Sequence, residues 1–155
     1  MNKEPETISA VLGVFNKPTL TGRVYHIDED KLKIIMDEKI GKFFGEMQYP
    51  TPPFNNPMAY IERFGQIDVD ENSGILRSYS IVKDDVVIKK AGKVLTLHAE
   101  IEPSEKLKQR IAAGVPIYFG IRTLGIPRVN FDDKDTYKHV DCFILSFDLM
   151  PENPY

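Results

Sequence analysis

A segment of seven residues in the middle of the chain alternates strictly between apolar and polar side chains. The apolar members are Leu95, Leu97, Ala99 and Ile101, and the polar members are Thr96, His98 and Glu100. Because successive side chains of a strand point to opposite faces of a sheet, the pattern predicts a strand with the first set inward and the second outward. The chain therefore has to build a sheet that is buried on one face.

Further segments of the sequence have strand character. Together with the alternating segment, the expected strands cover 8–15, 43–47, 75–82, 86–90, 94–102, 117–119 and 137–150. The dipeptides at 84–85 and 91–92 are expected to form turns between strands. Residues 130–136, with three aspartates, are expected to form a hydrophilic loop.

Two helices are predicted beside these strands. One runs from Asp28 to about Ile40 and the other follows Ser104, because both starting residues are suitable N-caps and a glycine ends each helix. Residues 58–64 fit either a helix or a strand, and the four prolines of 49–57 predict a loop. Together these elements predict an α+β fold: a mostly antiparallel sheet or barrel of six to eight strands with two helices.

The length and charge of the chain limit the classes of function. A chain of 155 residues is expected to form one domain, and its net charge of −3 argues against a broad phosphate-binding face. No apolar run reaches the ~18 residues of a membrane span. The expected partners therefore include neither nucleic acid nor membrane. The single cysteine, Cys142, excludes an internal disulfide framework and is expected to be a buried, inert thiol.

Neither a metal site nor a cofactor is expected. The three histidines, His26, His98 and His139, lack the spacing of metal ligands, and one cysteine cannot form a thiolate cluster. Asp132, Asp133 and Asp135 do not have the spacing of a calcium loop. Solvated or packed roles are the expectation for all of these side chains.

Two other groups of residues leave alternatives open. Ser78 and Ser80 are expected on the exposed face of a strand, where a Ser–His pair with a neighbouring strand would be conceivable. Arg122 is a lone cation in an apolar segment, and its expected roles are a salt bridge or a contact with backbone carbonyls. Gly120 and Gly125 are not followed by the Lys-Ser/Thr of a phosphate loop.

Six short elements stand in a definite order along the chain. They are TGRVY at 21–25, GEMQYP at 45–50, NPMA at 56–59, KL at 106–107 with IAAG at 111–114, YFGIRTLG at 118–125, and DLMP at 148–151. They match, in the same order, the elements NGRxY, GELxHP, PM, KL…IxAG, GVSSRGLG and DxxxxP, the last shortened by two in this chain. Over roughly residues 15–152 the chain thus resembles the prohead maturation proteases of tailed phages, which are related to the herpesvirus assemblins.

The resemblance fails at the catalytic positions. In the family, the His of GELxHP is the general base and a Ser of SSRG is the nucleophile. This chain has Tyr49 at the first position and Gly120-Ile121 at the second. A tyrosine hydroxyl, with an ordinary pKa of about 10, is a poor base at neutral pH, and Gly and Ile have no nucleophilic atom. The resemblance therefore implies a protease scaffold without catalysis, with at most a vestigial oxyanion pocket around Arg122.

A relocated catalytic site is the alternative within the same scaffold. Its hydroxyl would come from Ser104, Thr123 or Ser146, and its base would be His98 or His139. A third interpretation is a regulator that occupies or mimics the true protease, or an interaction module unrelated to phage heads. Nearness along the chain does not by itself create a positioned triad, so the inactive scaffold is preferred.

The resemblance implies a structural role in the phage head. The expected partner is the major capsid protein, bound by a decoration (cement) or core component, with self-association as a further expectation. The protein would then lie in the virion head, and in the host cytoplasm during assembly. The expected binding residues are Tyr49, Pro50, Pro52, Pro53, Phe54 and Arg122. The domain is expected at 15–152, after an arm or edge strand at 1–14 and before a tail at 153–155.

Overall fold

The computed structural model describes residues 6–50, 56–87, 93–123, 128–129, 138–141 and 144–155. These residues form eight strands, three α-helices and one 3-10 helix. In chain order they are β1 (Ile8–Phe15), β2 (Arg23–His26), α1 (Glu29–Lys39), α2 (Pro57–Phe64), η1 (Val69–Glu71), β3 (Gly74–Val87), β4 (Lys93–Pro103), α3 (Glu105–Ala112), β5 (Tyr118–Thr123), β6 (Arg128–Val129), β7 (Lys138–Asp141) and β8 (Ile144–Met150). The fold is α+β.

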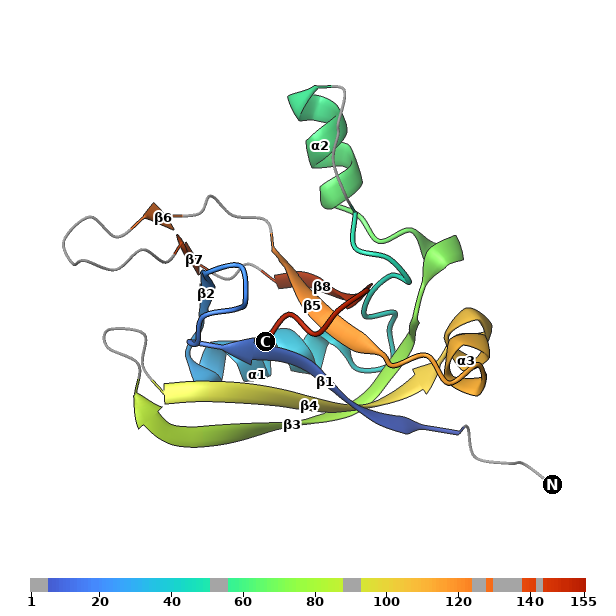
Figure 1. Cartoon of the computed structure of the whole chain (residues 1–155), viewed down its shortest axis with the longest axis horizontal. Coiled ribbons are helices and arrows are strands. Elements are labelled where there is room, and N and C mark those ends of the chain that lie inside the picture. Colours follow the sequence, from blue (N-terminus) through green and yellow to red (C-terminus); the bar gives the residue numbers. More distant parts are fainter. Residues whose placement is uncertain (1–5, 51–55, 88–92, 124–127, 130–137, 142–143) are drawn as a thin grey trace.

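The largest sheet has the strand order β1-β4-β3, and both of its pairs are antiparallel (Figure 1). The alternating segment is its central strand, β4, and the predicted inward and outward sets are confirmed. Leu95, Leu97, Ala99 and Ile101 are buried, whereas the three polar side chains between them are exposed or half-buried. One sheet face thus supplies part of the core, as its sequence requires.

Two smaller sheets complete the strands. β5 and β8 form an antiparallel pair, and β2, β7 and β6 form a three-stranded sheet in that order. The β2–β7 pair is parallel, so the fold is mostly, but not wholly, antiparallel. Residues 44–46 extend the β5–β8 pair on its other side, because Phe147 N donates to Phe44 O and Leu149 N donates to Glu46 O, each at 2.9 Å.

The two predicted helices are present with their predicted caps. Asp28 Oδ1 accepts from Lys31 N at 2.8 Å at the start of α1, and Ser104 Oγ accepts from Leu107 N at 3.2 Å at the start of α3. The expected number of helices was wrong, because residues 57–64 form a third, α2. Asn56 caps this helix through Oδ1, which accepts from Ala59 N at 2.8 Å. Figure 1 shows α2 projecting away from the strands.

Two strand predictions and one turn prediction were wrong. Residues 43–47 make isolated bridges at Phe43 and Glu46 rather than a strand, because the segment pairs only briefly with 72–75 on one side while residues 44–46 lie along β8 on the other. Residues 84–85 are not a turn: β3 runs through them, and a register shift between Asp84 and Val87 absorbs the extra residues. The single last strand is two, because β7 pairs with β2 and β6 whereas β8 pairs with β5.

Some predictions fall on residues outside the described part of the chain. These are the end of the strand expected at 86–90, the turn at 91–92, the loop at 130–136 and the position of Cys142.

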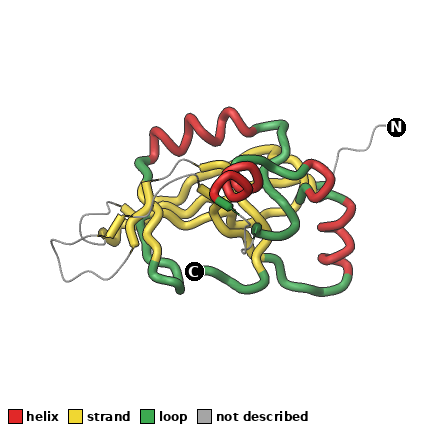
Figure 2. The backbone as a smooth tube through the Cα atoms, turned by 90° about the horizontal axis from the view of Figure 1, so that it is seen from above, coloured by secondary structure: helices red, strands yellow, loops and turns green. Residues whose placement is uncertain are grey.

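One hydrophobic core draws on most of the described elements. It includes side chains from β1, α1, β3, β4, α3, β5 and β8. Helix α1 lies along one side of the strands, and the C-terminal residues lie on the opposite side (Figure 2). Tyr79 of β3 fastens α1 to the sheet, because its hydroxyl donates to Asp37 Oδ1 at 2.6 Å. The first strand belongs to this core, since Leu12 and Phe15 are fully buried.

Candidate functional site

Strand β8 lies between the two positions where the resemblance expects catalytic residues. Tyr49 N donates to Leu149 O at 3.3 Å on one side of β8. On its other side, Gly120 of β5 pairs with Asp148 of β8. Neighbouring strands are about 4.8 Å apart, so the two backbone positions are separated by roughly 10 Å. The fold gathers these positions into one region, with a strand between them.

The nucleophile position is part of the packed interior. Gly120 and Ile121 are both buried in β5. A Cβ atom added at Gly120 would lie 2.8 Å from Cγ of Met150, so the side chain of Met150 occupies the space that a serine would need. Tyr49 is half-buried and Pro50 is buried. Pro52, Pro53 and Phe54 lie outside the described residues.

Arg122, the next residue along β5, lies at the centre of a buried ionic network. Its side chain is fully buried, as are those of Ser146 and Asp148 on β8. Arg122 Nε lies 2.7 Å from Ser146 Oγ, to which it donates, and 2.9 Å from Asp148 Oδ2. Arg122 Nη2 donates to Glu46 Oε2 at 2.6 Å. The network therefore joins β5, β8 and the segment before the proline-rich loop.

The same network holds the end of α2 and the residues that follow it. Arg122 Nη1 donates to the carbonyl oxygen of Gln66 at 2.9 Å. Arg63, in the last turn of α2, donates from Nη2 to Glu46 Oε1 at 2.6 Å and from Nη1 to Glu46 Oε2 at 3.0 Å. Glu46 thus joins two arginines, and the helix that projects from the body is fastened at its base.

The two roles considered for Arg122 from the sequence, a salt bridge and a carbonyl contact, both occur. Its guanidinium lies within the protein interior, where internal acceptors surround it, rather than at an open oxyanion pocket. Sequence reasoning missed Glu46 and Asp148 as its partners, although both stood within the matched motifs. The available signal was a carboxylate within an apolar run, since Asp148 stands between Phe147 and Leu149.

Burial and charge act in opposite directions on the two carboxylates. Burial raises the pKa of Asp148 to about 6, although Arg122 acts to lower it. Burial also acts to raise the pKa of Glu46, but hydrogen bonds from Arg63 and Arg122 outweigh it, so that this pKa is lowered. The carboxylate of Glu46, with two arginine partners, stays charged at neutral pH, whereas Asp148 takes up a proton as the pH falls through about 6.

The serines and histidine considered for a relocated site are placed apart. Ser146 Oγ lies within the ionic network, 3.1 Å from Asp148 Oδ1. Ser104 caps α3, and His98 is exposed on β4 in the other sheet. Ser80 of β3 pairs with His98 of β4, which is the register that the Ser–His pair considered from the sequence requires. Both side chains are exposed. The side chain of His139 lies outside the described part.

Among the described residues, no group of three or more His, Cys, Asp or Glu side chains gathers as metal ligands would. In the same part of the chain, no helix is long and apolar enough to cross a membrane. No family model, curated protein or solved structure matches this chain. What the fold and the site define is an α+β protein with a buried Arg–carboxylate network where the resemblance expects a catalytic centre.

The substitution Asp148→Asn is expected to change how stability depends on pH. The pKa of Asp148 rises from an ordinary 3.8 to about 6 on folding, so the folded chain keeps a proton that the unfolded chain has released. Its contribution to stability is full below about pH 4 and is lost as the pH rises through about 6. The loss amounts to at most about 3 kcal/mol.

Urea unfolding of both proteins between pH 4 and 7 measures this effect. The unfolding free energy of the wild type minus that of Asp148→Asn should fall as the pH rises. Glu46 is present in both proteins, so its opposite dependence largely cancels in the difference. Parallel pH profiles would show that Asp148 does not titrate in this range.

Proposed function

We propose that this protein is a catalytically inactive, prohead-protease-like structural component of a tailed-phage head that binds the major capsid protein. The proposal rests on the identity of the residues that occupy the region where the resemblance expects a catalytic site. Tyr49, Gly120 and Ile121 replace the base and the nucleophile, and the polar groups beside them belong to a buried ionic network. A region built in this way supports folding rather than acyl transfer.

The proline-rich loop at 49–57 and α2 are the proposed contact surface. Pro57, the last residue of this segment, is the first residue of α2, which projects from the body (Figure 1). Met58, in the first turn of α2, is 64% exposed. Because Arg63 and Glu46 fasten the other end of the helix, α2 is presented on a fixed base. Such preorganisation lowers the entropy cost of binding.

The copy number of the protein in purified mature particles tests this function. Quantitative mass spectrometry against the major capsid protein should give a stoichiometric ratio, with the chain intact from Met1 to Tyr155. Presence in proheads or infected cells, with absence from mature particles, would contradict a lattice role. It would favour a core, regulatory or protease role instead.

A further inference from the structure

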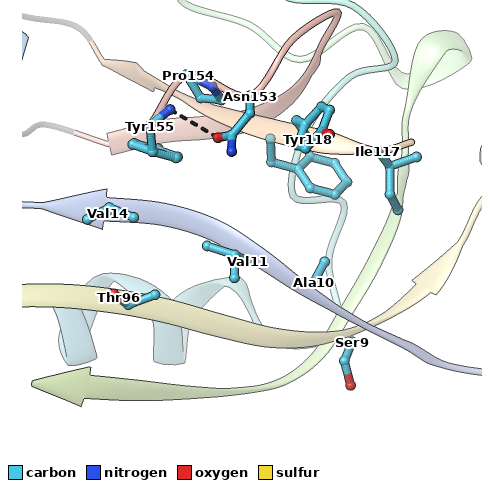
Figure 3. Close-up of a pocket in the computed structure, with 11 residues that line it drawn as sticks. Ser9, Ala10, Val11, Val14, Thr96, Ile117, Tyr118, Asn153, Pro154 and Tyr155 are labelled. Atoms are coloured by element: carbon cyan, nitrogen blue, oxygen red, sulfur yellow. Dashed lines mark hydrogen bonds between the residues drawn. The ribbon is translucent and has the colours of Figure 1, made fainter. Parts of the chain in front are cut away.

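A groove of about 470 Å³ opens between β1, β5 and the C-terminal residues (Figure 3). It lies outside the ionic network and outside the proposed contact surface. Its lining comes from residues 9–11, 117–119 and 153–155, together with Val14 and Thr96. Figure 3 shows residues 153–155 lying across from β1, with Tyr118 and Ile117 at one end.

The groove reaches the edges of strands as well as one sheet face, to which Val14 and Thr96 belong as a pair across β1 and β4. Successive side chains of a strand point to opposite faces, so a cavity that touches residues 9, 10 and 11 has to run along the edge of β1. The same reasoning applies to residues 118 and 119 of β5. In the sheet orders, β1 is terminal in β1-β4-β3 and β5 is terminal in β5-β8, so each presents an outer edge.

Backbone groups on these edges are open to pairing. In an antiparallel strand, alternate residues direct their N–H and C=O groups away from the neighbouring strand. In the described part of the chain, residues 8–12 have no backbone hydrogen bond beyond their ladder with β4. At Gly13 the two strands come close, since a Cβ atom there would lie 2.9 Å from Cγ1 of Ile121. The space alongside residues 9–11 is left for another chain.

The lining also restricts the chemistry of an occupant. None of the eleven lining side chains is charged, in a protein of which 28% is charged. Six of them are apolar, and hydroxyl and amide groups come from Ser9, Thr96, Asn153, Tyr118 and Tyr155. A charged occupant would lose hydration without gaining a countercharge from the lining side chains. An unpaired strand edge adds a requirement for backbone donors and acceptors, which an extended polypeptide supplies.

We propose that this groove binds an extended, uncharged segment of a partner polypeptide, which pairs with the outer edge of β1 as an added strand. The segment has small apolar side chains at alternate positions, and about five of its residues lie along residues 8–12, as the rise of a strand requires. The inference rests on the proposed function, because it names the part of a capsid-protein partner that this protein would hold.

An array of capped, uncharged heptapeptides tests the groove with the full-length protein. The peptides carry Ala, Val or Ile at alternate positions and Ser or Thr between them. At least one is expected to bind saturably and to shift the amide NMR signals of residues 8–12 and 118–119. The same peptide with N-methylated backbone nitrogens should bind about tenfold more weakly or worse, because it cannot donate to the edge.

Two aspartate variants separate the groove from the rest of the sheet. Val11→Asp places a charge in the groove and should weaken peptide binding by about tenfold or more. Val82→Asp is the matched control, since Val82 is an exposed valine on β3, the opposite edge strand. It should leave peptide affinity within about twofold. Thermal unfolding of both variants checks that each remains folded.

Four outcomes would overturn the proposal. These are saturable binding by no peptide of the array, equal binding of the N-methylated peptide, equal weakening by both variants, and a concentration-dependent dimer that Val11→Asp abolishes. The last would assign the groove to a second copy of this chain. If the peptide tests fail but the protein is stoichiometric in mature heads, only the groove proposal is overturned. If the peptides bind but the protein is absent from mature heads, only the proposed function is overturned.

Discussion

Replacing Arg122 by methionine is expected to lower the free energy of unfolding by about 3–5 kcal/mol. Methionine fills much of the same space but leaves Asp148 buried without its cation. Glu46 keeps Arg63 but loses its second arginine. The cost comes from the desolvated carboxylates that remain, not from the value of the ion pair itself.

The matched control is Arg77→Met. Arg77 also pairs with a carboxylate, Glu102, but its side chain is 42% exposed. Solvent compensates for such a loss, so we expect a change of at most about 1 kcal/mol. Urea unfolding at pH 7 measures both variants. Equal losses of unfolding free energy would mean that the buried Arg122 network contributes no more to stability than an exposed ion pair. The double variant Arg122→Met/Asp148→Asn should regain part of the loss.

Gly45→Ala is expected to lower stability by about 3 kcal/mol or more, because backbone atoms leave no room for a Cβ. A Cβ at this position would lie 1.6 Å from the carbonyl oxygen of Phe147. The chain would have to move away from β8 and give up the hydrogen bonds that Phe44 and Glu46 make on either side. Glu46 would move with it, so the variant also disturbs the ionic network.

Gly41→Ala separates crowding from backbone conformation. Gly41 has a φ of +80° but no atom within 4 Å of an added Cβ. Its cost should therefore be the conformational one alone, about 1–2 kcal/mol. Chemical denaturation and amide NMR spectra of the two variants provide the comparison. A Gly45→Ala protein no less stable than Gly41→Ala would contradict the close approach to Phe147.

Local sequence patterns correctly predicted those helices and strands that depend on residues close together in the sequence. The alternation in β4 and the caps of α1 and α3 depend on residues a few positions apart, and the structure confirms them. Residues 58–64 stayed open between helix and strand because apolar residues dominate a short segment. Asn56, whose side chain caps α2, was the local sign of a helix. The assignment of β7 and β8 to different sheets lacked such a sign, since each strand has its partners far away in the sequence.

The candidate site shows the same division. The sequence by itself determined which groups are missing, because a residue without a nucleophilic atom lacks one in any fold. It also offered both roles that Arg122 has. Only the tertiary structure decided the partners of Arg122, since Glu46 and Asp148 lie 76 and 26 residues away. The groove between β1 and β5 likewise depends on which strand edges remain open. Ion pairs and sheet edges are set by long-range packing, to which short-range periodicity does not extend.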